Sequence, residues 1–248
     1  MLFRSQVRAY ALKAPDFGWG GAEAGERTKM LFINSPHNPT GAVLSKEELG
    51  QIADFAKANN LLVVSDEAYD RLLYDGLEHR SIASEPGMRD RTVILGSFSK
   101  TYSMTGWRIG YLAGPAEVIR GMALLQQSFV LSVNSFAQWG AVEAMTGPQD
   151  CVEEMRQQFD IRRKAMMEAL STIPNVSFAA PKGAFYIYLN HEKTGLDPVQ
   201  FCAKLLDEYY VACVPGSEYG PYAGCNTRLS CATGLEGVDR IRKMVASL

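Results

Sequence analysis

The sequence predicts an α/β fold in which a mainly parallel sheet is flanked by helices and followed by a smaller α+β part. Apolar runs of strand length recur in the first half of the chain, at 30–34, 61–65 and 92–96. Segments with helical periodicity separate these runs, and strands that alternate with helices favour parallel pairing. The runs are continuously apolar, which is typical of strands that are covered on both faces.

The first helix is expected to begin after residue 45. A turn cluster rich in Pro, Asn and Gly occupies 35–41, directly after the first strand. Ser45 and Glu48 have the spacing of a capping box, in which each side chain satisfies the other residue's backbone N–H. Apolar residues then recur at i, i+3, i+4 and i+7, which predicts the buried face of a helix that ends before Asn59. These are Leu49, Ile52, Ala53 and Ala56.

A break near residue 150 divides the expected elements into two groups. A further strand over 108–114 and a helical stretch over 116–146, interrupted near 132–135, complete the first group. Gly147 and Pro148 then begin a break. We therefore expect a larger domain at 1–150 and a small C-terminal domain at 151–248. The second group contains helices and short strands at 151–172, 176–179, 184–189, 197–209, 211–214, 227–232 and 235–247.

Composition argues against several classes of protein. The 248 residues are 47% apolar and 21% charged, close to the globular average. With 25 basic and 27 acidic side chains, the net charge of −2 argues against a nucleic-acid partner. No apolar run is long enough for a membrane helix, and the N-terminus lacks the apolar core of a signal peptide. Five cysteines without a C-x-x-C pair argue against a disulfide framework or a metal site and favour a cytoplasmic protein.

Charged side chains stand at the ends of the expected strands, and the carboxyl ends are where open α/β sheets bind ligands. Lys100 is either a solvated surface lysine or a nucleophile that forms a Schiff base. Asp66 is either a turn cap or a buried partner of a cationic ligand. Arg108 and Arg228 lie in expected strands, where each would need a protein carboxylate or an anionic ligand as a partner. Taken one by one, these residues leave the alternatives open.

Five short motifs in this order resemble those of class I/II pyridoxal-phosphate-dependent aminotransferases, which have the aspartate aminotransferase fold type I. They are Asn38-Pro39-Thr40-Gly41, Asp66-x-x-Tyr69, Ser97-x-Ser99-Lys100, Gly106-Trp107-Arg108-x-Gly110 and Asn226-Thr227-Arg228-Leu229-Ser230. Each motif is weak alone, but all five occur at the expected structural locations. The resemblance implies the latter part of a large cofactor-binding domain followed by a whole small domain, without the N-terminal third of the family's chain.

The resemblance implies cofactor and catalytic roles at the strand ends. Lys100 would be the catalytic residue, which holds pyridoxal 5'-phosphate as a Schiff base and moves the substrate's α-proton. Asp66 would pair with the pyridine nitrogen and keep it protonated. Tyr69 and Asn38 would hydrogen-bond the oxygen on the cofactor ring.

The resemblance also implies two anion-binding groups. Ser97 and Arg108 would bind the cofactor phosphate, and Ser99 would belong to the same cofactor site. Arg228, with Asn38 beside it, would bind the substrate carboxylate, a task suited to the planar guanidinium. No metal ligand is implied.

Two histidines and two aromatic residues receive structural interpretations instead. His79 and His191 are expected at the surface. Trp107 and Tyr111 are expected in the core.

The implied activity is transfer of an amino group between an L-amino acid and a 2-oxo acid by a homodimer that acts on neither nucleic acid nor membranes. A lyase or decarboxylase of the same fold remains an alternative, because it would share Lys100, Asp66 and Arg228. A noncatalytic truncated remnant is a second alternative. It is considered because the residues before Met30 offer no match to the helix N-terminus whose backbone N–H groups bind the cofactor phosphate in the family.

Overall fold

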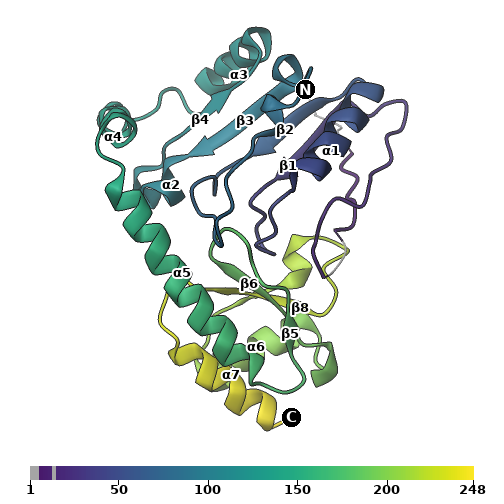
Figure 1. Cartoon of the computed structure of the whole chain (residues 1–248), viewed down its shortest axis with the longest axis vertical. Helices are drawn as coiled ribbons and strands as arrows, with labels where there is room; N and C mark the ends of the chain where they lie inside the picture. Colours follow the sequence, from purple (N-terminus) through teal and green to yellow (C-terminus); the bar gives the residue numbers. More distant parts are fainter. Residues whose placement is uncertain (1–5, 13–14) are drawn as a thin grey trace.

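The structure is a computed structural model that describes residues 6–12 and 15–248, and it contains two four-stranded sheets (Figure 1). The first has the order β1-β2-β3-β4, built from β1 (Met30–Asn34), β2 (Leu62–Asp66), β3 (Thr92–Ser97) and β4 (Gly110–Ala113). The second has the order β5-β6-β8-β7, built from β5 (Ser177–Phe178), β6 (Tyr186–Asn190), β7 (Val214–Pro215) and β8 (Asn226–Ser230). Its neighbouring strands are all antiparallel.

Helices precede, connect and cover the two sheets. The α-helices are α1 (Lys46–Ala58), α2 (Phe98–Thr101), α3 (Ala116–Phe129), α4 (Ser135–Thr146), α5 (Asp150–Ser171), α6 (Pro198–Tyr209) and α7 (Glu236–Ala246). Short 3-10 turns are η1 (Ile82–Ser84), η2 (Arg89–Arg91), η3 (Thr105–Trp107), η4 (Glu192–Thr194) and η5 (Gly216–Tyr219). Figure 1 shows α5 running from the first sheet down to the second, so that this helix bridges the two parts.

The parallel pairing of the first three strands confirms the predicted sheet. β1 pairs with β2, and β2 with β3, with Asn34 opposite Asp66 and Asp66 opposite Leu95. The strands therefore end together at one edge, where α2 begins directly after β3. The capping box at α1 also forms as predicted: the Glu48 N–H donates to Ser45 Oγ at 3.2 Å and the Ser45 N–H donates to Glu48 Oε2 at 2.7 Å.

β4 differs from its prediction in its bounds, and it is the antiparallel strand of the mainly parallel sheet. It begins at Gly110 rather than Arg108, because Arg108 has left-handed backbone angles (φ 53°, ψ 48°) at the end of η3. It is antiparallel to β3, with Gly110 opposite Ser97. The chain re-enters the sheet at the edge where β3 leaves it, so the connection does not cross the sheet as a parallel strand would require.

The second part has a closed hydrophobic core. Helices α5, α6 and α7 pack their apolar side chains against the β5–β8 sheet. Leu170, Ile187, Phe201 and Leu205 are completely buried there. His191, expected at the surface, is also completely buried and stacks on Phe201 with ring centroids 3.9 Å apart. Burial lowers the pKa of His191 to about 4, so the ring is neutral at pH 7, and its Nε2 lies 3.1 Å from Thr227 Oγ1.

The first part leaves much of its β4 side uncovered. None of the residues of β4 or α3 is buried, although α3 is rich in apolar side chains. Phe129 at the end of α3 is 77% exposed and Trp139 in α4 is 74% exposed. Trp107 and Tyr111, expected in the core, are partly exposed for the same reason. Within residues 6–12 and 15–248, no helix has the length and apolar content needed to span a bilayer.

Arg163 on α5 joins the two parts. Its side chain is only 3% exposed. It donates to Asp75 Oδ1 in the first part at 2.8 Å, to Asp160 Oδ1 at 2.8 Å and to the Pro181 carbonyl at 2.7 Å. The guanidinium also lies over the ring of Tyr74, 4.6 Å from its centroid. A buried guanidinium needs such partners, because an unpaired buried charge is strongly destabilising.

Candidate active site

Lys100 lies on α2, immediately after β3. Ser97 ends β3 and caps this short helix, because its Oγ accepts from the Ser99 N–H at 3.2 Å. Thr101 donates to Asp70 Oδ1 at 3.0 Å and so ties the helix to the segment after β2. Ser97, Ser99 and Lys100 therefore lie together at the carboxyl edge of the first sheet, as the sequence predicts.

The surroundings of Lys100 make its ammonium group lose a proton more readily than that of a lysine in water. Partial burial, followed by repulsion from Arg228 and Arg108, lowers the pKa of Lys100. Its Nζ lies 5.4 Å from the centroid of the Phe185 ring. A neutral amine is nucleophilic and accepts protons, so this electrostatic setting suits covalent and base chemistry. A small cavity of about 140 Å³ opens beside the amine and is lined by Ser99, Lys100, Ser103, Thr105, Phe159 and Phe185.

Two adjacent carboxylates at the end of β2 have pKa values that are shifted in opposite directions. Burial raises the pKa of Asp66, and one hydrogen bond, from the Ala68 N–H at 3.1 Å, partly offsets it. Burial opposes ionisation of Glu67 too, but hydrogen bonds from His79 at 2.7 Å and Ser81 at 2.6 Å lower its pKa. Glu67 is thus satisfied by the protein, whereas Asp66 still has capacity for a cationic partner.

The second sheet contributes Arg228 to the same site. Its Nη1 donates to Asn38 Oδ1 at 3.0 Å, across 190 residues of sequence. The guanidinium lies over the rings of Tyr186 and Tyr219, 4.4 Å and 5.5 Å from their centroids. Two aromatic faces and one amide oxygen hold this guanidinium, and they leave its remaining N–H groups for a carboxylate.

Tyr69 lies close to Arg228, but its hydroxyl forms a hydrogen bond with another protein side chain. Its hydroxyl shares a 2.9 Å hydrogen bond with that of Tyr186. Burial, then this hydrogen bond, raises the pKa of Tyr69, so the phenol is protonated at neutral pH. Tyr186 therefore connects Tyr69 to Arg228, and Arg228 in turn bonds to Asn38.

Arg108 is the most exposed of the predicted site residues. Its left-handed backbone ends η3, and its Nη1 donates to the Thr105 carbonyl at 2.9 Å. Its charge reaches Lys100, whose pKa it helps to lower. The structure thus places Arg108 beside the site while its side chain contacts its own turn.

The charges of the site lack protein counter-ions. Across residues 6–12 and 15–248, none of the salt bridges involves Lys100, Arg108, Arg228 or Asp66. Three cations and one half-buried carboxylate at one edge match a ligand that carries anionic groups and one cationic nitrogen. In the same part of the chain, no group of three or more His, Cys, Asp or Glu side chains is arranged to hold a metal ion.

Two contributors to the site, Tyr219 and Asn34, were not given a role in it by the sequence analysis. Tyr219 lies against Arg228, and Asn34 contacts the segment that carries Asn38. Tyr186 also lies against Arg228 and belongs to the segment 183–186, for which the resemblance implies at most a minor part in binding the substrate. The partners of Tyr219 and the cofactor-site partner of Asn34 come from distant segments, so only the tertiary structure shows their involvement.

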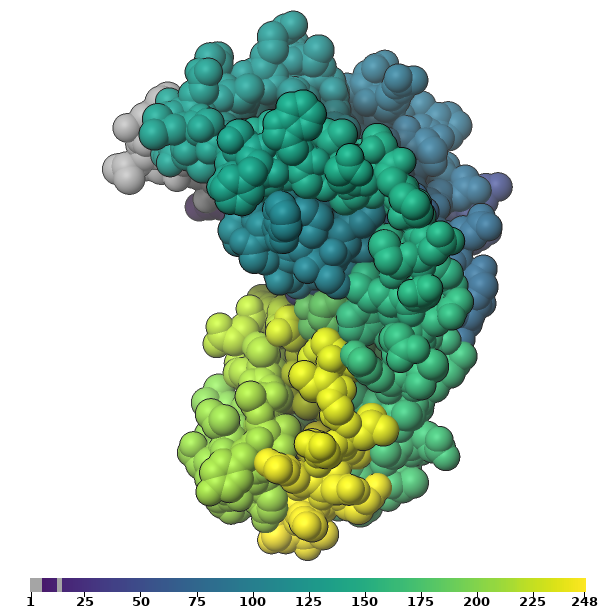
Figure 2. All heavy atoms as spheres, turned by 90° about the vertical axis from the view of Figure 1, so that its left-hand side faces the viewer, coloured from purple at the N-terminus to yellow at the C-terminus, as the bar shows by residue number. Residues whose placement is uncertain are grey.

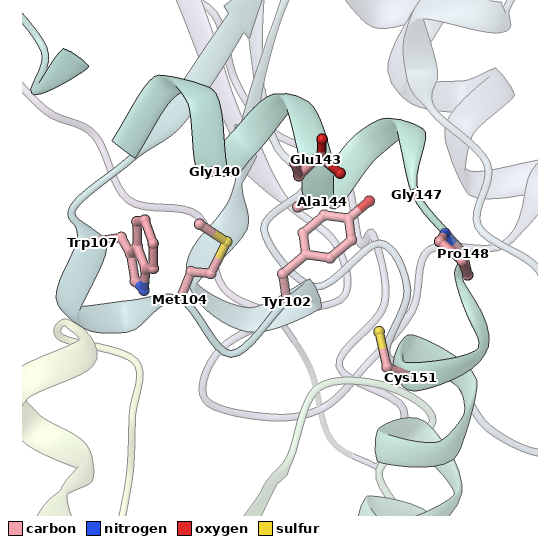
Figure 3. A pocket seen from close by; sticks show the side chains of 9 residues that line it. All are labelled: Tyr102, Met104, Trp107, Gly140, Glu143, Ala144, Gly147, Pro148 and Cys151. Carbon is pink, nitrogen blue, oxygen red and sulfur yellow. The ribbon is translucent and has the colours of Figure 1, made fainter. Parts of the chain in front are cut away.

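A larger, shallow hollow lies away from Lys100 and is lined mostly by apolar atoms. Figure 3 shows Trp107, Met104 and Tyr102 beneath α4, with Cys151 at the start of α5. Its volume is about 380 Å³. It contains no lysine or arginine, so it does not suit a phosphate. Figure 2 shows the broader indentation of the surface between the first part and the second.

Three kinds of similarity relate this chain to known proteins. Residues 12–242 match the family described as aminotransferase class I and II. The chain is 44% identical over 230 residues to an aspartate aminotransferase of Bacillus sp. (strain YM-2), a match that covers 89% of this chain and 58% of the relative. It is 40% identical over 227 residues to aromatic-amino-acid aminotransferase 2 of Thermococcus litoralis, a match that covers 88% and 58%.

Solved structures agree with the sequence relatives. An aromatic aminotransferase from Pyrococcus horikoshii OT3 superposes with a TM-score of 0.87 at 40% identity, over 90% of this chain and 61% of that one. A Thermus thermophilus aspartate aminotransferase superposes with a TM-score of 0.83 at 37% identity, over 91% and 58%. This chain spans about 58% of the length of the curated relatives it matches.

Proposed function

Because the chain belongs to the aminotransferase class I and II family, we propose that it acts as a pyridoxal-phosphate-dependent aminotransferase. The reaction would move an amino group between an L-amino acid and a 2-oxo acid. One observation carries the proposal: Lys100 with a lowered pKa, Asp66 and Arg228 gather at one sheet edge without protein counter-ions. Each of the three groups then has a separate task.

The residues present fit pyridoxal phosphate. When bound, this cofactor supplies an electron-withdrawing ring that stabilises the carbanion left when an amino acid loses its α-proton. Asp66 would accept a hydrogen bond from the pyridinium nitrogen, the cationic partner that its setting lacks. Ser97, Ser99 and Arg108 would bind the phosphate, and Tyr69 and Asn38 would contact the ring oxygen.

Lys100 would be both the attachment point and the base. The burial and the two arginines that lower its pKa keep a larger fraction of the amine unprotonated near neutral pH. A neutral amine can bond to the cofactor aldehyde and, once displaced by the substrate, can take and return the α-proton.

Arg228 would orient the substrate by its α-carboxylate, with Asn38 beside it. Stacking on Tyr186 and Tyr219 fixes the plane of the guanidinium, which restricts the approach of a carboxylate. Relatives are named aspartate and aromatic-amino-acid aminotransferases, so we propose aspartate and aromatic amino acids as the first donors to test.

The organisation of the protein is part of the same proposal. We propose residues 1–150 as the latter part of the cofactor-binding domain and 151–248 as the small domain, which is supported by their separate sheets. A homodimer is supported by the exposed apolar side chains of α3 and α4. A cytoplasmic location is supported by five cysteines that form no disulfide.

Absorbance in the presence of pyridoxal phosphate tests the function. The chain is expected to develop a visible band that Lys100→Ala abolishes and that Lys193→Ala, at an exposed lysine on η4, retains. Reduction with borohydride followed by peptide mass spectrometry should locate the cofactor on Lys100. Identical spectra for the chain and Lys100→Ala would overturn the assignment.

A second candidate function is cofactor binding without turnover. It is favoured by the open setting of Arg108 and by the uncovered β4 side next to it. An assay of amino acids with 2-oxoglutarate separates the two candidates. Formation of new amino acid supports the aminotransferase, whereas a visible band without product supports binding alone.

A further inference from the structure

Asn34 has no assigned role, yet it lies between the two halves of the site. It is the last residue of β1 and pairs in register with Asp66, the last residue of β2. Four residues later the chain reaches Asn38, which contacts Arg228. Asn34 thus contacts both the end of β2, which carries Asp66, and the segment that carries Asn38.

The Asn34 side chain bridges these two segments with both of its polar atoms. Its Nδ2 donates to the Asp66 carbonyl at 3.0 Å, and its Oδ1 accepts from the Asn38 N–H at 2.8 Å. The neighbours determine this orientation, because the opposite one would face oxygen with oxygen and N–H with N–H. No acidic or aliphatic side chain of similar size could make both bonds.

We propose that Asn34 is a positioning residue, which holds Asn38 and the Arg228 bonded to it at a fixed distance from Asp66. This inference rests on the proposed function, because the distance between Asp66 and Arg228 matters only if Asp66 binds the cofactor ring and Arg228 binds the substrate carboxylate. The connected atoms run from the Asp66 carbonyl through the Asn34 amide to the Asn38 backbone, and from the Asn38 side chain to Arg228.

The Asp66 carbonyl accepts a second hydrogen bond, so a loss of positioning by Asn34 can be told apart from unfolding of the strand ends. The Ser35 N–H also donates to the Asp66 carbonyl, at 3.1 Å. The end of β2 therefore keeps a partner when Asn34 loses its side chain. The Asn38 N–H, in contrast, has Asn34 Oδ1 as its partner among the described residues. Loss of Asn34 should accordingly release the Asn38 segment and leave the strand ends paired.

Ligand binding provides the first test, with Asn34→Ala compared with Asn59→Ala. Asn59 is a matched control, because its side chain bonds only its own helix end, at the Phe55 carbonyl 2.8 Å away. In the cofactor-loaded chain, Asn34→Ala should bind the dicarboxylate maleate about tenfold more weakly, while its affinity for pyridoxal phosphate changes by less than about threefold. An unchanged affinity for maleate, or equal losses for both ligands, would overturn the proposal.

Hydrogen exchange provides a test that needs no cofactor. In the cofactor-free chain, the Asn38 amide should exchange at least about tenfold faster in Asn34→Ala. Asn34→Asp keeps an acceptor for that amide and should restore slow exchange. Unchanged exchange in Asn34→Ala would overturn the positioning role. If the chain binds no pyridoxal phosphate at all, the proposed function fails, and the exchange experiment still decides the role of Asn34.

Discussion

The two sheets of this molecule are packed to very different extents. The β5–β8 sheet is covered by three helices whose side chains form a closed core. The β1–β4 sheet is covered on one face of β1 and around β2, but the other face of β1, with Met30 53% and Phe32 52% exposed, is open, as are β4, α3 and much of α4. The expectation that the first strand is covered on both faces is therefore wrong. Each sheet supplies residues of the candidate site. The site residues therefore lie both in the well-packed region and in the poorly covered one.

Large aromatic truncations should show the difference most strongly. Phe201→Ala removes a completely buried ring from the second core and should lower the free energy of unfolding by about 4 kcal/mol. Phe129→Ala, at the exposed end of α3, should change it by less than about 0.5 kcal/mol in the monomer. Urea unfolding of both variants, at a concentration where the chain is monomeric, measures this. A similar loss in the monomer would break the comparison, whereas a loss that appears only in the dimer would place α3 at the subunit interface.

Acid should destabilise both regions through one buried histidine each. Burial lowers the pKa of His191 in the second part and of His37 in the first to about 4, from an ordinary 6.5. The unfolded chain therefore binds more protons between these values. The associated stability is complete above pH 6.5 and is lost as pH falls to about 4, by about 3 kcal/mol for each histidine.

Chemical unfolding between pH 7 and 4 measures this loss. His191→Asn and His37→Asn should each remove about half of the slope. A stability that stays constant from pH 6.5 to 4.5 would contradict the burial of both rings. A slope that only one variant reduces would show that one region opens to water and the other does not.

Arg228→Lys examines the junction between the two regions. Lysine keeps the charge but loses the planar donors and most of the stacking, so amino-acid affinity should fall about 30-fold. Cofactor affinity should change by less than about threefold, because the groups proposed to bind the cofactor phosphate, Ser97, Ser99 and Arg108, lie in the first part. Equilibrium titrations of both ligands check this, with Arg242→Lys, at a half-exposed position of α7, as the control. Equal losses for both ligands would remove Arg228 from the substrate site.

The smallest effect should be the same in both regions. α1 and α6 begin with capping boxes, at Ser45 with Glu48 and at Asp197 with Gln200. Ser45→Ala and Asp197→Ala should each cost about 1 kcal/mol in urea unfolding. Helix starts depend on local contacts, so a difference above about 1 kcal/mol would indicate that regional packing controls them.

Local sequence patterns predicted the parts of the fold that local contacts determine. The three parallel strands, the α1 capping box and the break between α3 and α4 agree with the structure. Lys100 and Asp66 were singled out because they follow apolar runs at strand ends, and their proposed roles come from motifs that resemble those of the family. The exposure of Tyr111 and Trp107 could not be predicted, because apolar periodicity does not show which faces the rest of the chain covers.

The missed contributors share a different cause. Tyr219 and Asn34 act through partners far away in sequence, and nothing in their local pattern identifies those partners. His191 was misplaced because its burial depends on stacking against Phe201 and a contact with Thr227, 3.1 Å from its Nε2. Sequence motifs thus indicate which groups to propose as reactive, and the tertiary structure shows which groups hold them in place.

Arg163 is an example of a residue that holds the two parts of the molecule in place. It is bonded at once to Asp75 of the first part, to its own helix and to the backbone before β6, so one side chain ties the two parts together. Two backbone hydrogen bonds, from the Lys182 N–H to the Gly41 carbonyl and from the Ala184 N–H to the Leu72 carbonyl, join the same two parts. A rotation of one sheet against the other would have to break the bonds of a guanidinium whose side chain is only 3% exposed. The separation of the two halves of the proposed site therefore depends in part on a residue that lies outside all five motifs.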